Sequence, residues 1–255
     1  RLTAALIGFF GDREYYQRLL RFALPIALQS FATSLLNMVG GLMVGQLGDA
    51  SVAAVALAGQ IAFLLQLSLF GITSGSAIFT AQLWGKQDVP NIRRVLGVSL
   101  LMGAVPGFVF WLLSQLAPES VLGIYSKDPQ VVALGAGYLR VFGWSFVLLV
   151  ITLSYSAVLR SIGNVMLPLA VSTCALGLNI ILSYILIFGK FGFPEMGVNG
   201  AAWASLIARA VECFVMLALT YRFRLPAAIH LADFLSLDLP FRGKVLKPVL
   251  PVAFN

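Results

Sequence analysis

The sequence predicts an all-α membrane protein, a bundle of six transmembrane helices, on three grounds: composition, the length of its apolar segments and the placement of its cations. Hydrophobic residues make up 60% of the 255-residue chain, charged residues make up 11%, and the mean hydropathy is +0.94. A soluble domain usually carries about 25% charged residues. Membrane lipid is therefore the expected environment of this chain.

Six apolar segments are long enough to cross a bilayer as helices, because about 20 residues span its hydrocarbon core. They lie near residues 23–47, 52–83, 92–116, 131–158, 164–188 and 197–221. Helices satisfy every backbone hydrogen bond within such segments. The second segment is too long for one straight crossing, so we expect it to tilt or to project from the bilayer.

The breaks between the segments contain residues that favour turns and helix ends. They fall at Gly48-Asp49, at residues 85–88, at Pro118-Glu119, at residues 161–164 and at residues 189–194. Each break contains a glycine, a proline or a short polar residue, so the segment count does not depend on hydropathy alone.

Lysine and arginine alternate between the two sides of the predicted bundle. Those on one side precede the first segment or follow the second, fourth and sixth: Arg13, Arg18, Arg21, Lys86, Arg93, Arg94, Arg160, Arg222 and Arg224. The opposite connections carry only Lys127 and Lys190. The positive-inside rule then predicts a multi-pass protein of the inner (plasma) membrane with a cytoplasmic N-terminus. The net charge of +7 forms no arginine-rich or aromatic-interleaved patch, so we expect no nucleic-acid partner.

A repeat links the two ends of the chain. Residues 18–29 read RLLRFALPIALQ, and residues 244–255 read KVLKPVLPVAFN. Such a repeat is typical of transporters built by duplication; the alternative is chance similarity between two basic-then-apolar junctions. The repeat predicts the first half of a protein of roughly 450 residues. Its parts are a cytoplasmic or interfacial segment (1–22), a six-helix N-terminal lobe (23–221), a cytoplasmic linker (222–243) and the start of helix 7 of a second lobe (244–255).

Polar residues inside the apolar segments form stripes at helical spacing. Polar groups that face lipid are costly, so such residues usually turn inward. The three stripes are Gln29, Thr33, Asn37 and Gly40; Tyr138, Ser145, Thr152 and Ser156; and Ser172, Asn179 and Ser183. Small and amide residues also join helices together, but three aligned stripes favour a common cavity.

Two charged residues lie deep in a predicted span, and no catalytic motif accompanies them. Arg209 and Glu212 stand three residues apart and can pair on one helix face, while Arg140 lies near the outer end of its segment. Local neutralisation is the simpler role of this possible ion pair, and ion coupling is the alternative. The sequence lacks HExxH, Walker A and GxSxG motifs and any cysteine-histidine cluster. We therefore expect no enzyme, no catalytic residue and no metal site.

Five motifs, in order along residues 15–255, resemble the N-terminal lobe of a multidrug and toxic compound extrusion (MATE) transporter. They are PIALQSFATSLLNMVGGLMVGQLG, SVAAVALAGQI, QLWGKQD, LRSIGNVMLP and GLNIILSYILIFGKFGFPEMGVNGAAWAS. The resemblance implies one lobe of a twelve-helix, two-lobed, V-shaped transporter. Its expected function is secondary active export of amphipathic organic cations in exchange for inward proton or sodium flow. The expected partners are these small cations and the C-terminal lobe of the same protein, with no cofactor beyond the coupling ion.

The resemblance also implies a cavity that has lost its acids. Many relatives carry aspartate where this chain has Gly40 and Ser183, whereas Tyr138, Asn179 and Ser205 match polar positions of the pocket. Ion coupling is then expected in the second lobe, and Gly40 is expected to leave open space.

Two alternatives stay open. One is a non-transporting, degenerate half-transporter that serves as a membrane scaffold subunit, as the missing acids suggest. The other is a lipid-linked oligosaccharide flippase of the same superfamily, which would favour a more cationic cavity than Arg209 and Arg140 provide.

Overall fold

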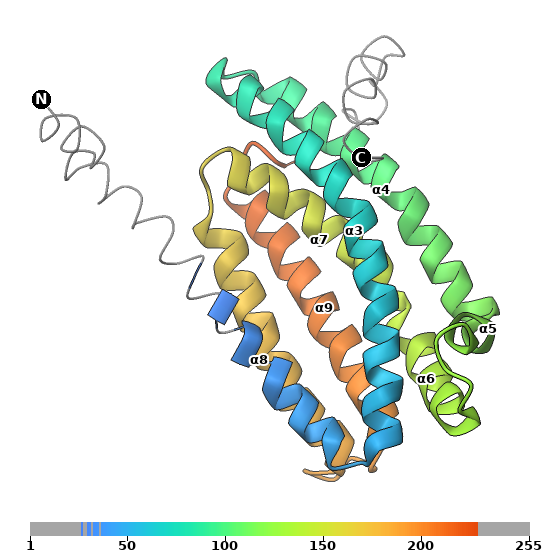
Figure 1. Cartoon of the computed structure of the whole chain (residues 1–255). Coiled ribbons are helices and arrows are strands. Elements are labelled where there is room, and N and C mark those ends of the chain that lie inside the picture. Colours follow the sequence, from blue (N-terminus) through green and yellow to red (C-terminus); the bar gives the residue numbers. More distant parts are fainter. Residues whose placement is uncertain (1–26, 28–29, 32, 36, 229–255) are drawn as a thin grey trace, which may run out of the picture.

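The structure of the chain, a computed structural model, describes residues 27, 30, 31, 33–35 and 37–228 (Figure 1). A short apolar helix, Thr33–Gly45, comes first. It is followed by α3 (Asp49–Gly85), α4 (Val89–Leu116), α5 (Pro118–Gly123), α6 (Pro129–Phe142), α7 (Trp144–Ser161), α8 (Met166–Phe188) and α9 (Gly197–Arg222). The described part of the chain contains helices and no strand. This confirms the predicted all-α bundle.

Five of these helices, α3, α4, α7, α8 and α9, are long and apolar enough to cross a membrane. Their bounds agree with the predicted segments except between residues 131 and 158. There, one expected helix is divided into α6 and α7 at Gly143. A Cβ atom at Gly143 would collide with the side chain of Ser114 on α4. The division therefore lies where α4 packs directly against the backbone between α6 and α7.

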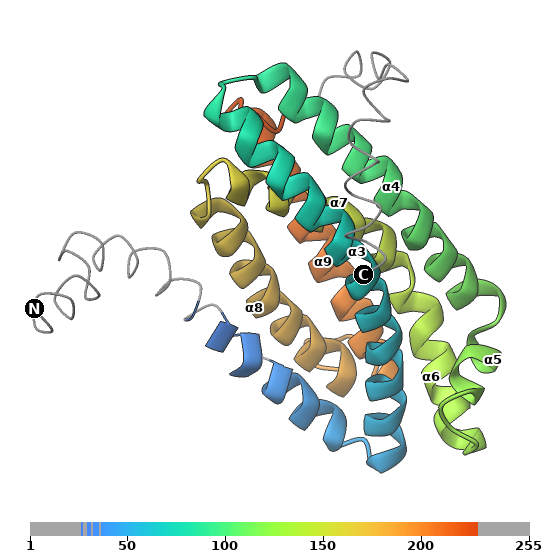
Figure 2. The same ribbon diagram turned by 45° about the horizontal axis from the view of Figure 1, so that its top comes forward.

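Helix α3 is longer than one membrane crossing requires. Its 37 residues correspond to about 55 Å of helix at 1.5 Å per residue. The hairpin that α3 forms with α4 extends past the neighbouring ends of α7 and α8 (Figures 1 and 2). The sequence predicts that the 52–83 segment tilts in the bilayer or projects from it; this extension is compatible with projection, and the choice between the two stays a prediction.

The helices begin and end at the predicted breaks because local side chains satisfy their terminal backbone groups. At the start of α4, Asp88 accepts a hydrogen bond from the backbone N–H of Asn91, and at the start of α6, Asp128 accepts one from Gln130. Both are typical N-cap contacts. Helix α8 ends at Gly189, whose φ of 62° lies in the left-handed region. That conformation favours glycine, and a Cβ there would also approach the Glu195 backbone nitrogen to 2.8 Å.

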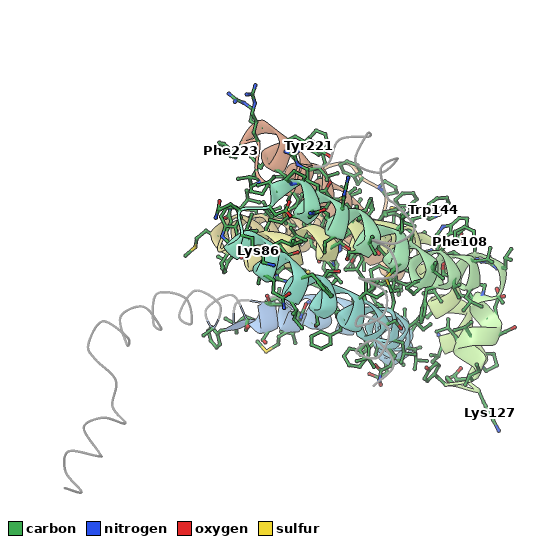
Figure 3. The ribbon with its side chains drawn as sticks, turned by 90° about the horizontal axis from the view of Figure 1, so that it is seen from above. Lys86, Phe108, Lys127, Trp144, Tyr221 and Phe223 are labelled. Carbon is green, nitrogen blue, oxygen red and sulfur yellow. The ribbon has the colours of Figure 1, made fainter. Side chains whose placement is uncertain are left out.

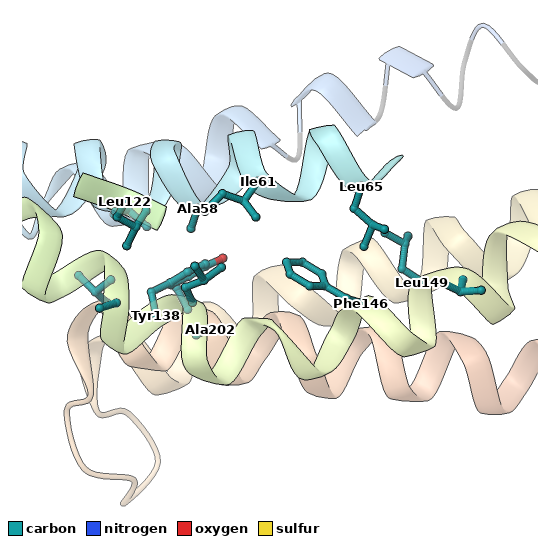
Figure 4. Packing of buried hydrophobic residues seen from close by; sticks show 14 of the residues in the cluster. Ala58, Ile61, Leu65, Leu122, Tyr138, Phe146, Leu149 and Ala202 are labelled. Atoms are coloured by element: carbon teal, nitrogen blue, oxygen red, sulfur yellow. The ribbon is translucent and has the colours of Figure 1, made fainter. Parts of the chain in front are cut away.

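The main core lies between α3 and the helix pair α6–α7. Leu65 of α3 and Phe146 of α7 are almost fully buried, as are Leu122 of α5, Leu139 of α6 and Ala202 of α9. Figure 4 shows Ala58, Ile61 and Leu65 of α3 facing Tyr138 and Phe146. Large apolar side chains on the outer faces of α3 and α4 stay exposed, such as Phe63, Phe70 and Phe108. An apolar exterior of this kind suits contact with lipid.

Glycine permits two close helix contacts. A Cβ at Gly107 of α4 would lie 2.6 Å from a methyl carbon of Val150 on α7. A Cβ at Gly200 of α9 would lie 2.6 Å from the carbonyl carbon and oxygen of Leu186 on α8. The second contact is with backbone, which cannot move aside as a side chain can. Small residues at helix interfaces allow such approach in membranes, so Gly200 fixes the spacing of α8 and α9.

The lysines of the connections separate into two ends of the bundle. Lys86 follows the last residue of α3. Tyr221 and Phe223 mark the end of α9. Lys127 extends from a different part of the molecule than these residues (Figure 3). A Cβ at Gly197, the first residue of α9, would lie 3.9 Å from Leu47, just before α3 begins. Lys190 therefore belongs to the end where α3 starts. The predicted N-terminal segment (1–22), the second-lobe start (244–255) and most of the linker (222–243) lie outside the described residues.

We expect single cysteines at Lys127 and Lys190 to react with a membrane-impermeant thiol reagent added outside intact cells. A cysteine at Lys86 should react only after the membrane is opened, because the positive-inside rule places that end in the cytoplasm. Cys174 and Cys213 are replaced by alanine first. Labelling of the Lys86 position in intact cells would reverse the orientation.

We expect Gly200→Ala to lower the free energy of unfolding by about 1–3 kcal/mol, as overpacking does where the neighbour is rigid. The control is Gly177→Ala on α8, where an added Cβ meets nothing within 4 Å. Thermal unfolding of the purified protein in detergent measures both variants. Equal midpoints for the two would show that α8 and α9 do not depend on this contact.

Candidate functional site

A polar cavity of about 420 Å³ opens among α3, α6, α7, α8, α9 and the Thr33–Gly45 helix. The polar and charged residues that line it are Thr33, Asn37, Gln66, Tyr138, Thr152, Ser156, Arg160, Ser172, Asn179, Ser205, Arg209 and Glu212. A second hollow of about 300 Å³ shares Asn37, Tyr138, Asn179 and Ser205 with the first. The two are therefore adjoining parts of one polar region inside an apolar bundle.

Helix periodicity explains how residues far apart in sequence meet at this region. The adjacent helices α8 and α9 bring Asn179 opposite Ser205, and the Asn179 side-chain amide donates a hydrogen bond to the Ser205 hydroxyl over 3.2 Å. From α6, Tyr138 reaches the same region, and its ring lies 5.3 Å from that of Phe142, one turn later. Phe142 also lines the larger cavity. The site thus combines neutral hydrogen-bonding groups with two aromatic rings.

The predicted cavity residues occupy the two hollows as follows. Thr33 and Asn37 line the larger one, while Gly40 and Ser183 line the smaller one. A Cβ at Gly40 would meet nothing within 4 Å, so the expected open space is present. Gln29 lies outside the described residues.

One residue of the predicted stripes is placed differently. Ser145 is buried but lines neither hollow, although Thr152 and Ser156 of the same helix line the larger one. Gly143 keeps right-handed helical angles (φ −56°, ψ −30°), and its N–H donates to the Leu139 carbonyl, so Tyr138 on one side of it and Thr152 on the other still line one cavity. Of the four residues expected on this stripe, Ser145 is therefore the one that lines neither hollow.

The predicted ion pair is present in the wall of the larger cavity. The Arg209 Nη1 donates to Glu212 Oε2 over 2.6 Å, and the Ser172 hydroxyl of α8 donates to Glu212 Oε1 over 2.7 Å. Only 6% of the Glu212 side chain is exposed, against 36% of the Arg209 side chain. Each carboxylate oxygen therefore has a donor, and the arginine remains half open to the cavity.

The arginines that line the cavity differ from those expected from the sequence, because Arg140 does not line it and Arg160 does. Arg140 pairs with Glu119 over 2.9 Å on an exposed surface and does not line the cavity. Arg160, interpreted from the sequence only as a marker of orientation, lines it instead. Gln66 of α3 was also missed; its signal was an isolated amide within a long apolar segment.

The described residues contain no group of three or more histidine, cysteine, aspartate or glutamate side chains able to hold a metal ion. Cys174 is exposed and Cys213 is buried, and both are free thiols. The chemistry available in the described part of the cavity is therefore hydrogen bonding, aromatic contact and charge.

Comparison with known proteins agrees with this architecture. The sequence pattern of the family described as MatE matches residues 25–185. The chain is 33% identical over 196 residues to the probable multidrug resistance protein NorM of Rhizobium meliloti, covering 75% of this chain and 41% of that protein. It is 26% identical over 237 residues to the probable multidrug resistance protein YoeA of Bacillus subtilis, covering 92% and 51%.

Solved structures show the same fold. An outward-facing multidrug resistance MATE family transporter of the MOP superfamily superposes with a TM-score of 0.79 at 24% identity, covering 92% of this chain and 51% of that one. An inward-facing structure of such a transporter gives a TM-score of 0.74 at 26% identity, covering 87% and 49%. The chain thus spans about half the length of the proteins it matches, as one lobe of a two-lobed transporter does. The family match covers more than half of the chain, and the chain therefore belongs to the MatE family.

Proposed function

We propose that this chain is the N-terminal lobe of a secondary active exporter of amphipathic organic cations in the inner membrane, with its N-terminus in the cytoplasm. The observation that carries the proposal is the polar cavity at membrane depth. Its volume of about 420 Å³ lies within the usual range of small-molecule sites, roughly 300–1,000 Å³. Polar residues at such depth are costly unless they serve a pathway or pair with each other.

The lining of the cavity supports a substrate with an aromatic body and a cationic centre. Tyr138 and Phe142 lie side by side in the wall, and aromatic faces attract organic cations. Asn179 and Ser205 provide neutral hydrogen-bonding partners. This lining recognises a cation without a free carboxylate, which agrees with glycine at position 40 and serine at position 183.

Export of a cation needs an opposing ion flow, because each outward charge costs about 2.3 kcal/mol per 100 mV of membrane potential. Among the described residues, Glu212 is the one carboxylate that lines the cavity. Neutral Asn179 and Ser183 can offer oxygens to sodium but cannot exchange protons near neutral pH. We therefore place coupling, by protons or sodium and without further cofactor, in a C-terminal lobe of the same protein.

The direct test uses the full-length protein reconstituted in lipid vesicles loaded with ethidium, an aromatic organic cation. We expect extrusion when a proton or a sodium gradient is imposed, and none when both gradients are collapsed. Failure to move ethidium or other organic cations under either gradient, in a folded protein, would favour the scaffold alternative.

We expect the extrusion rate of Glu212→Gln still to respond to an imposed pH gradient. Arg209 and Ser172 already occupy both Glu212 oxygens, so this carboxylate serves the ion pair in the cavity wall and is not the expected coupling group. Glu119→Gln, which alters an exposed ion pair, is the matched control for expression and folding. Loss of the pH response in Glu212→Gln alone would make Glu212 the coupling group.

A further inference from the structure

We propose that Arg209, positioned by Glu212, binds a carboxylate on the substrate, so that this lobe selects zwitterionic amphiphiles among organic cations. The inference rests on the proposed export function and deepens it. It begins from the charges that line the cavity, which are those of Arg160, Arg209 and Glu212. Their sum is one net positive charge in the described wall.

The carboxylate of Glu212 is not available to a ligand. One oxygen accepts from Ser172 and the other from Arg209, and the side chain is 6% exposed. A cationic group that entered the cavity would therefore have to displace a short, charge-assisted contact to reach it. Glu212 holds the arginine in place and does not attract the substrate.

Arg209 has N–H donors that its contact with Glu212 does not use. A guanidinium carries five N–H donors, and within the described residues Arg209 uses one nitrogen, Nη1, for Glu212. Its side chain is 36% exposed and lines the cavity. The planar fork of arginine matches a carboxylate in two-point contact. A guanidinium whose rotamer is already fixed on one side loses less freedom when it binds an anion on the other.

A second cation, Arg160, also adds positive charge to the cavity wall. Arg160 of α7 lines the cavity and forms no ion pair with the acids of the described residues. Tyr138 and Phe142 line the cavity as well. The aromatic rings can hold the cationic ring system of a substrate while the arginines attract its acid. This division of charge suits a zwitterion better than a simple cation.

The depth of Arg209 favours a small molecule over a lipid headgroup. Arg209 is twelve residues after Gly197 and thirteen before Arg222, the two ends of α9. At 1.5 Å per residue, either end is about 18–20 Å away. Headgroups lie at the bilayer surfaces, about 15 Å from the midplane, so a molecule inside the cavity reaches Arg209 more readily.

The test compares two dyes that differ in one group, rhodamine B with a free carboxylate and its ethyl ester without one. Binding of each to the purified full-length protein is measured by fluorescence anisotropy. We expect wild type to prefer the acid. Arg209→Gln combined with Glu212→Gln should weaken binding of the acid by about tenfold, the effect of one charge-assisted hydrogen bond, and lower the acid-to-ester ratio.

Glu212→Gln alone should have the opposite effect. The glutamine oxygen can still accept from Arg209 and keep it in place, while the charge that neutralises Arg209 is removed, so the acid-to-ester ratio should rise. Opposite shifts in the single and double variants cannot come from a general loss of structure. The single variant also keeps the proposal testable if the double variant does not fold. Arg140→Gln removes an arginine outside the cavity and should leave the ratio at the wild-type value.

Three outcomes of the dye comparison, and one of a lipid competition, would overturn the proposal. They are equal binding of both dyes by wild type, a ratio that does not move in either Glu212 variant, and equal shifts in the Arg140 control. Phosphatidylglycerol is added in a separate arm; if it displaces both dyes and requires Arg209, the site belongs to lipid phosphate and the proposal fails. Transport is scored separately in vesicles. Absence of export with dye discrimination intact would refute the proposed function and leave the carboxylate site standing.

Discussion

The close approach of α8 and α9 is the constraint on which the polar region depends. Gly200 brings the backbone of α9 against Leu186, and two side-chain hydrogen bonds then cross the same interface, from Asn179 to Ser205 and from Ser172 to Glu212. Hydrogen bonds of this kind need helix spacing fixed to a few tenths of an ångström. The backbone contact at Gly200, near one end of the α8–α9 pair, thus sets the helix spacing at which the polar groups further along the two helices meet.

The opposite wall of the cavity is built from helices that are joined less regularly. Helices α6 and α7 are separated at Gly143, where Ser114 of α4 packs against the backbone. Tyr138 precedes this division, while Arg160 lies in the last turn of α7. The aromatic and cationic parts of the wall therefore belong to separate helices. The closely packed helices α8 and α9 therefore form one side of the cavity, and the shorter helices α6 and α7 form the other.

Hydropathy, turn residues and cation placement were enough to predict the helical bundle and most helix bounds, because lipid leaves few alternatives to a helix. Periodicity within one helix also placed Asn37 and Asn179 at the cavity. It failed at Ser145, which is buried between helices but lines neither hollow. It also missed Arg160, because a residue at the end of a helix has the same sequence pattern whether it faces headgroups or a cavity. Both failures concern contacts between helices, which a single segment does not encode.

The pair of Arg209 and Glu212 is difficult to explain by stability alone. Replacing a buried ion pair with apolar groups of similar volume is often neutral or stabilising, since desolvation offsets the attraction of the charges. Ser172 compensates the carboxylate, but 36% of the Arg209 side chain remains exposed, so the pair is not sealed within the helix interface. The unequal burial is expected where one charge serves to fix the other toward an open space, and the cavity is the space that Arg209 faces.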